Sequence, residues 1–221
     1  MQSLPKSICF IETKTGVGTG AIFEIEEIPK YFCMITCFHV LSPDCVSDAL
    51  IKFKGCARFK FKPEWIVRKS FKPKGKGDYM AVVLQPEAVA FLEMQNLKFL
   101  KVKSAKADEQ IVLMGYPDAE IDNPEMSFGT GPIYNIDEFT IIYSAGTGEG
   151  SSGSPLVLLT GEAIGIHRSR QREQDTSNIV LNIVGPARYA TSLEKIKEDL
   201  LLDFGTLKHS HHMLVISFII I

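Results

Sequence analysis

The chain has 221 residues, of which 45% are hydrophobic and 23% are charged, with a formal net charge of −2. A chain of this length and balance builds a full hydrophobic core as one domain or two closely packed lobes, without metals or disulfides to hold it. The near-neutral charge argues against bulk attraction to nucleic acid or to an anionic membrane. We therefore expect no cofactor, no nucleic acid and no membrane among its partners.

The cysteines do not form a recognisable framework. There are five of them, all near the start of the chain: Cys9, Cys33, Cys37, Cys45 and Cys56. An odd number with this spread is not typical of paired disulfides, and their spacing does not match a zinc site. The first residues also lack the apolar segment of a secretory signal. Together these features predict an intracellular protein without a bound metal.

Most of the chain predicts short strands separated by glycine- and proline-containing turns, which indicates an antiparallel barrel or sandwich. In chain order the expected strands are Ile8–Ile11, Ala21–Ile25, Phe32–Cys37, Leu50–Phe53, Ala57–Phe61, Tyr79–Leu84, Gln110–Met114, Thr140–Tyr143, Leu156–Leu159, Ala163–Ile166 and Ile179–Ile183.

Two segments interrupt this pattern with helical character. Residues Glu87–Leu100 are rich in helix-forming residues. Residues Ser192–Leu202 start with a serine cap and place Leu193, Ile196 and Leu200 on one apolar face, which favours docking on a core.

Residues 51–62 alternate between apolar and basic side chains. Ile51, Phe53, Phe59 and Phe61 occupy one face, and the other carries Lys52, Lys54, Arg58, Lys60 and Lys62. Alternation of this kind is typical of a half-solvated strand pair. A basic surface that attracts an acidic partner is the alternative interpretation, with Lys72, Lys74 and Lys76 contributing.

The strongest chemical motif is Gly150-Ser151-Ser152-Gly153-Ser154-Pro155, which lies in a glycine-rich loop before an apolar strand. Glycines on both sides of Ser152 allow a tight turn that exposes its hydroxyl. The N–H groups of Gly150 and Ser152 would then form an oxyanion hole, at about 3–4 kcal/mol of barrier per donor. The motif predicts Ser152 as a nucleophile, although a flexible Gly/Ser loop is the simpler interpretation.

A nucleophilic serine needs a histidine base, and the histidine needs a carboxylate that orients it. His39 follows the apolar strand Phe32–Cys37, whereas three of the other histidines lie in the polar tail and His167 follows a strand close after the serine. Asp78 opens the apolar strand Tyr79–Leu84, where a buried acid is costly without a partner. We therefore expect His39 to be the base and Asp78 its orienting acid.

With His39, Asp78 and Ser152 in this order, the chain resembles the chymotrypsin/trypsin-like serine proteases. The resemblance covers roughly residues 8–203 and rests on GVGTGAIFEI, TCFHV, GDYMAVV, GYP, GSSGSP and GEAIGIH. It implies an all-β fold of two antiparallel six-stranded barrels with a C-terminal helix. The peptidase domain would span residues 1–208, with barrels at 1–98 and 99–208, followed by a tail at 209–221 of unknown role.

The chain also departs from this family. Secreted trypsins have aspartate directly before the nucleophile, where it receives the new N-terminal amine after zymogen cleavage, but this chain has Ser151. The family's disulfide near the catalytic histidine cannot be assigned, and Cys37 is expected to be a small buried side chain. The chain is therefore more similar to intracellular and bacterial trypsin-like peptidase domains than to digestive trypsin.

Substrate preference is expected to depend on Thr147 and His167, a pair that resembles the pocket residues of glutamyl endopeptidases. A hydroxyl and an imidazole N–H both donate to a side-chain oxygen, which favours Glu, Gln or Asp before the scissile bond. The alternative is that His167 only packs or bonds to backbone. The substrate would be a protein or peptide.

Three other functions were compared with the same residues. A catalytically silent or partner-activated module that binds peptides would carry the same residues. An esterase is disfavoured because Ser154, rather than glycine, stands two residues after Ser152 and because a strand follows. A phosphate-binding loop at residues 16–20 is disfavoured because a strand follows it.

Overall fold

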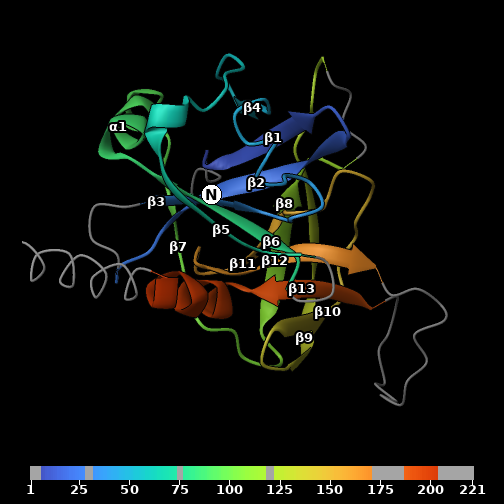
Figure 1. The fold of residues 1–221 in the computed structure, drawn as a ribbon. Helices are drawn as coiled ribbons and strands as arrows, with labels where there is room; N and C mark the ends of the chain where they lie inside the picture. Colours follow the sequence, from blue (N-terminus) through green and yellow to red (C-terminus); the bar gives the residue numbers. More distant parts are fainter. Residues whose placement is uncertain (1–5, 28–31, 74–76, 118–121, 171–186, 204–221) are drawn as a thin grey trace, which may run out of the picture.

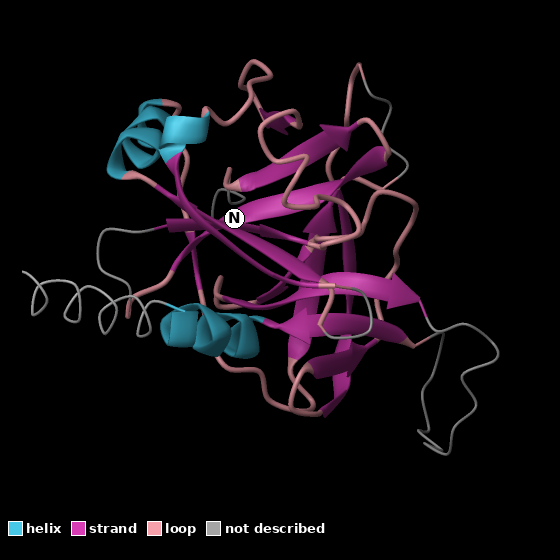
Figure 2. Cartoon of the chain, viewed as in Figure 1, coloured by secondary structure: helices cyan, strands magenta, loops and turns pink. Residues whose placement is uncertain are grey.

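The computed structural model describes residues 6–27, 32–73, 77–117, 122–170 and 187–203. Strands dominate these segments, and helices lie only at the margins of the molecule (Figures 1 and 2). The strands form two sheets, one in each half of the chain, which we call the N-terminal and C-terminal lobes. The all-β fold class with a terminal helix, expected from the sequence, is therefore confirmed.

The N-terminal lobe is an antiparallel sheet in the order β4-β1-β2-β3-β6-β5. A short seventh strand, β7 (Leu100–Lys101), is added parallel to β2. The six strands of the main path are β1 (Ile8–Thr13), β2 (Gly16–Glu24), β3 (Phe32–Thr36), β4 (Leu50–Phe53), β5 (Ile66–Lys72) and β6 (Tyr79–Leu84).

The C-terminal lobe is a closed six-stranded barrel in the order β10-β13-β12-β11-β8-β9. Closure leaves the barrel without an exposed strand edge. Its strands are β8 (Gln110–Gly115), β9 (Ser127–Ile136), β10 (Thr140–Tyr143), β11 (Pro155–Leu158), β12 (Ala163–Arg170) and β13 (Arg188–Ser192).

Most expected strands are present, and the differences have physical causes. The segment expected at 57–61 pairs only through one bridge from Phe59 to Ile51. Strands β5, β7, β9 and β13 were not expected. Charges interrupt β5, and two glycines and a proline in β9 read as a turn. In β9, a Cβ at Gly131 would overlap the carbonyl oxygen of Ser144, so the barrel needs glycine there. The expected strand at 179–183 lies outside the described residues.

Both expected helices are present, one of them shorter. Helix α1 (Pro86–Met94) ends before Asn96, which adopts a left-handed φ of 57°. The short 3₁₀ helix η1 (Pro63–Trp65) contacts it. The second helix is described over residues 193–203. Among the described residues, no helix has both the length and the apolar character needed to span a bilayer.

Burial follows the predicted apolar faces. In the segment 51–62, Ile51, Phe53 and Phe61 are buried and Lys54, Lys60 and Lys62 are exposed, as alternation requires. The helix at 193–203 follows the last strand of the C-terminal barrel. It buries Leu193, Ile196 and Leu200 in a hydrophobic cluster made mostly of N-terminal-lobe residues. This helix therefore ties the two lobes together.

Truncating the buried face of this helix should destabilise the protein. Leu200 is fully buried, whereas Leu202 on the same helix is 70% exposed. We expect Leu200→Ala to lower the free energy of unfolding by about 2–5 kcal/mol, measured by urea denaturation. The matched control Leu202→Ala should change it by less than about 0.5 kcal/mol. Equal losses in both variants would show that the helix is not docked as described.

Candidate active site

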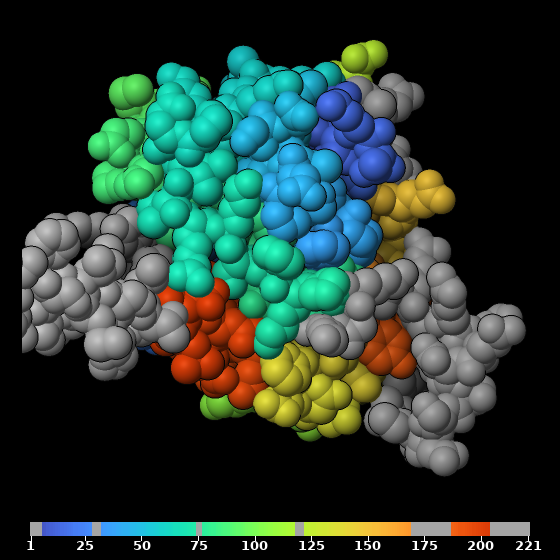
Figure 3. All heavy atoms as spheres, in the orientation of Figure 1, coloured from blue at the N-terminus to red at the C-terminus, as the bar shows by residue number. Residues whose placement is uncertain are grey.

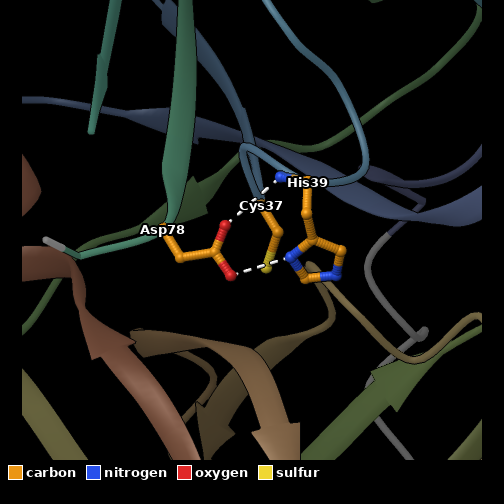
Figure 4. A group of neighbouring side chains, drawn as sticks. All are labelled: Cys37, His39 and Asp78. Atoms are coloured by element: carbon orange, nitrogen blue, oxygen red, sulfur yellow. Dashed lines mark hydrogen bonds and ion pairs between the residues drawn. The ribbon is translucent and has the colours of Figure 1, made fainter. Parts of the chain in front are cut away.

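His39 and Asp78 lie side by side at one end of the N-terminal sheet. His39 comes shortly after β3 and Asp78 directly precedes β6; these strands pair with Thr36 opposite Met80. The imidazole Nδ1 is 2.7 Å from Asp78 Oδ2, and the His39 main-chain N–H donates to Asp78 Oδ1 over 3.2 Å. Figure 4 shows both side chains facing one another. Sequence reasoning predicted this pair, and the structure brings it together.

Asp78 adopts a backbone conformation that few residues tolerate. Its φ is 50°, in the left-handed region, and the preceding Gly77 has a φ of 126°. Aspartate is among the residues that accept this conformation, and glycine accepts it freely. The turn aims the carboxylate away from β6 and toward His39. The Asp78 side chain is 1% exposed, while that of His39 is 37% exposed, so the acid is buried and the imidazole has a solvent-facing side.

The C-terminal lobe holds this turn from both sides. The buried Thr191 hydroxyl of β13 donates a hydrogen bond to the Gly77 carbonyl. After Asp78, the Tyr79 hydroxyl donates to Asp199 over 2.9 Å, and Lys72 forms an ion pair with the same carboxylate at 2.7 Å. Burial raises the pKa of Tyr79, so its hydroxyl stays protonated as the donor. In Figure 3 the red helix that carries Asp199 packs directly against the N-terminal lobe.

Ser152 lies on a tight loop between β10 and β11. Gly150 and Gly153 have φ values of 82° and 86°, which explains the need for glycine on both sides. Thr19 of β2 binds this loop twice: its hydroxyl donates to the Gly150 carbonyl over 2.9 Å, and its N–H donates to the Ser152 carbonyl over 2.8 Å. The carbonyls on either side of Ser151 are therefore both turned toward Thr19.

The N–H groups of the loop divide into two sets. Those of Gly148, Ser151, Gly153 and Ser154 donate to protein acceptors. Among hydrogen bonds within the described segments, none uses the N–H of Gly150 or Ser152. These are the two groups that sequence reasoning assigned to an oxyanion hole.

Contacts between the lobes bring the serine loop against the histidine strand. The carbonyl of His167 accepts the N–H of Gly153 over 2.8 Å and the thiol of Cys37 over 3.1 Å. Gly18 is confined between Val40 and the Ser152 carbonyl, where a Cβ would lie 3.2 Å from that oxygen. Residues next to His39 and next to Ser152 thus share partners. Within the described part of the chain, no hydrogen bond joins the Ser152 hydroxyl to His39.

His167 is buried on β12, with its ring against Tyr143 of β10. The Tyr143 hydroxyl is 2.8 Å from His167 Nδ1, and the two rings meet edge to face. Burial raises the pKa of Tyr143, so the phenol keeps its proton. The protonated phenol is able to donate to Nδ1, and in that arrangement the imidazole proton of His167 is on Nε2. Thr147 is half-buried in the loop that carries Ser152.

Sequence reasoning missed several residues that build the site. Thr19, Tyr143 and Thr191 position the serine loop, His167 and the Asp78 turn respectively. Thr19 is a polar residue in the middle of an otherwise apolar strand, and this was the available clue. The partners of Tyr143 and Thr191 are far away in sequence, so only the fold reveals them.

Comparison with known proteins supports this architecture. Residues 18–166 match the family model of the trypsin-like peptidase domain. The serine protease domain of the Sesbania mosaic virus polyprotein has 18% identity and a TM-score of 0.58, with 88% of this chain and 92% of that chain covered. The Rv3671c protease of M. tuberculosis has 16% identity and a TM-score of 0.59, with 89% of this chain and 88% of that chain covered. At these identities the structural matches establish the fold alone.

The close approach of the serine loop to Thr19 gives a direct test. A Cβ at Gly153 would overlap the Thr19 carbonyl and the Thr36 hydroxyl, and φ there is unfavourable for alanine. We expect Gly153→Ala to lower the free energy of unfolding by at least about 1–3 kcal/mol in chemical denaturation. Gly146→Ala, in the same loop with open space around it, is the control and should have little effect. An unchanged free energy of unfolding in Gly153→Ala would contradict this packing.

Proposed function

Because the chain belongs to the trypsin-like peptidase family, we propose that it is a serine endopeptidase with His39, Asp78 and Ser152 as its catalytic triad. The observation that carries this proposal is the 2.7 Å contact between His39 Nδ1 and the buried Asp78 carboxylate. The serine loop is bound to the strand next to this pair. An imidazole oriented in this way presents its Nε2 as a base.

In the proposed reaction, the Ser152 hydroxyl attacks the peptide carbonyl carbon and His39 Nε2 takes its proton. The tetrahedral intermediate then collapses, the C–N bond breaks, and His39 returns the proton to the leaving amine. Water repeats the sequence on the acyl-enzyme, with His39 as base, and releases the acid. Asp78 stays ionised throughout and stabilises the imidazolium.

The N–H groups of Gly150 and Ser152 complete the proposed site. Thr19 binds the carbonyls of Gly150 and Ser152, which supports the backbone of the loop that carries both donors. Preorganised donors of this kind stabilise the oxyanion by about 3–4 kcal/mol each, because no reorganisation is needed as charge develops.

The same proposal includes a preference for Glu, Gln or Asp before the scissile bond. We take the Tyr143 hydroxyl as the donor to His167 Nδ1, over 2.8 Å, which would leave Nε2–H as a fixed donor. A neutral imidazole donor together with the Thr147 hydroxyl would suit a carbonyl or carboxylate oxygen of the substrate side chain.

The proposal also includes an intracellular, reducing compartment. All five cysteines are free thiols, which fits such a compartment.

Covalent labelling tests the proposed nucleophile. A fluorophosphonate probe should modify the wild-type protein once, and mass spectrometry should locate the adduct on Ser152. Ser152→Ala should lose the adduct, and His39→Ala should label at least about 10³-fold more slowly because the base is missing. A folded wild-type protein that is not labelled would favour the alternative, a silent or partner-activated module that binds peptides.

The specificity proposal is tested by Tyr143→Phe, which keeps the ring and removes only the hydroxyl. In peptides that differ only before the scissile bond, the wild type should cleave after Gln or Glu faster than after Phe or Arg. In the variant, the kcat/KM for the Gln peptide divided by that for the matching Leu peptide should fall at least about tenfold. The reason is that His167 is then no longer held in one tautomer. An unchanged ratio, or faster cleavage after Phe or Arg by the wild type, would contradict the proposed pocket.

A further inference from the structure

The proposed reaction does not use the thiol of Cys37, although this thiol lies directly beside the His39–Asp78 pair. Cys37 Sγ, a ring nitrogen of His39 and a carboxylate oxygen of Asp78 all lie within 4.8 Å of one another. Figure 4 shows the sulfur next to the contact between the imidazole and the carboxylate. Within the described residues, this is the group of His, Cys and Asp side chains with spacing suited to a metal ion.

The donor types match one class of cation. Thiolate, imidazole and carboxylate are the ligands that Zn²⁺ takes in proteins, and three protein ligands with one open position is a common zinc arrangement. Mg²⁺ and Ca²⁺ prefer oxygen donors and would not use the sulfur. Cys37 and Asp78 are both 0% exposed, so a cation bound by them would be largely shielded from water.

We propose that Cys37, His39 and Asp78 form an inhibitory Zn²⁺ site built into the catalytic centre. Binding of the ion is independent of the proposed peptidase function, whereas inhibition rests on it. The zinc ion, a thiolate and a carboxylate sum to zero charge, which suits a buried position. Burial and the nearby Asp78 carboxylate raise the pKa of the Cys37 thiol well above its usual value, so the ion has to displace the thiol proton when it binds. The charge of Arg168 acts in the opposite direction on the thiol.

Binding changes the protonation of two groups. The Cys37 S–H bond and its hydrogen bond to the His167 carbonyl both break. A sulfur lone pair then binds the zinc, and the proton leaves to solvent. The lone pair of His39 Nδ1 also binds the metal, so the imidazole proton moves from Nδ1 to Nε2 through solvent. A protonated Nε2 has no lone pair to accept the Ser152 proton. Zinc thus blocks general-base catalysis without touching the serine.

The site must open slightly to admit the ion. Two ligands on a tetrahedral zinc are about 3.3 Å apart, whereas Nδ1 and Oδ2 are now 2.7 Å apart. His39 is the ligand that is free to move, because the residue lies beyond the end of β3 and its side chain is 37% exposed. A small outward swing of the imidazole would make room, with Cys37 and Asp78 remaining in place.

The experiment uses the full chain in a Cys45→Ser/Cys56→Ser background, which removes the two half-buried thiols. Cd²⁺ is the spectroscopic probe, because its bond to a thiolate gives an ultraviolet charge-transfer band that does not depend on activity. Zn²⁺ is the inhibitor probe, scored as the fluorophosphonate labelling rate with zinc divided by the rate with a chelator. Because this ratio compares each variant with itself, differences in basal activity between variants do not affect it.

We expect one Cd²⁺–thiolate band per chain and slower labelling in zinc. Cys37→Ala should lose the band and weaken zinc inhibition at least about tenfold. Cys33→Ala removes a buried thiol from β3, the strand that Cys37 directly follows, and should keep both the band and the inhibition. Asp78→Asn, scored by the Cd²⁺ band alone, should weaken binding at least about tenfold.

Two results would overturn the proposal: no Cd²⁺ band in the background protein, or equal zinc sensitivity with and without Cys37. If Cys37→Ala does not fold, unweakened Cd²⁺ binding by Asp78→Asn would overturn it instead. A Cd²⁺ band lost with Cys37, in a protein that never labels even with chelator, would support the metal site while contradicting the peptidase proposal.

Discussion

The carbonyl oxygen of His167 accepts hydrogen bonds from two parts of the chain that are far apart in sequence. Gly153, next to the proposed nucleophile, donates its N–H, and Cys37, just before the proposed base, donates its thiol. Thr19 makes a second such link by binding the carbonyls of Gly150 and Ser152. These few polar contacts set the serine loop against the histidine strand. The proposed chemistry depends on them, because no single element carries all three triad residues.

The same dependence on both lobes applies to the acid. Asp78 has a left-handed conformation that costs free energy and persists only where the surroundings enforce it. Thr191 and Asp199, both from the C-terminal part of the chain, bind the residues on either side of Asp78. The helix that carries Asp199 is itself docked through buried leucine and isoleucine side chains. Hydrophobic burial of that helix thus supports the geometry of a carboxylate in the other lobe.

Local patterns were sufficient to predict part of this arrangement. The alternation or apolar character of β4, β6 and β10 predicted their bounds, and the glycines around Ser152 predicted its tight turn. The pairing of His39 with Asp78 was also predictable, since each lies at the end of an apolar strand. These features are encoded by neighbouring residues, which is why the sequence alone reveals them.

Other features depend on contacts between distant segments. Strand β9 has the composition of a turn because the backbone at Ser144 crosses over Gly131. Thr19 and Tyr143 acquire their roles from carbonyl and imidazole partners over a hundred and over twenty positions away. The place of Cys37 next to the His39–Asp78 pair likewise follows from how β3 and β6 meet. Residue types and spacing do not predict such contacts.

The central claim is that this site hydrolyses peptide bonds through Ser152. The most direct measurement is cleavage of a mixed peptide library by the purified full chain, with Ser152→Ala assayed in parallel and cut positions identified by mass spectrometry. The account predicts cuts that vanish in the variant and that follow Glu, Gln or Asp. Cuts that persist in Ser152→Ala, or a folded wild-type protein that cuts nothing, would contradict it.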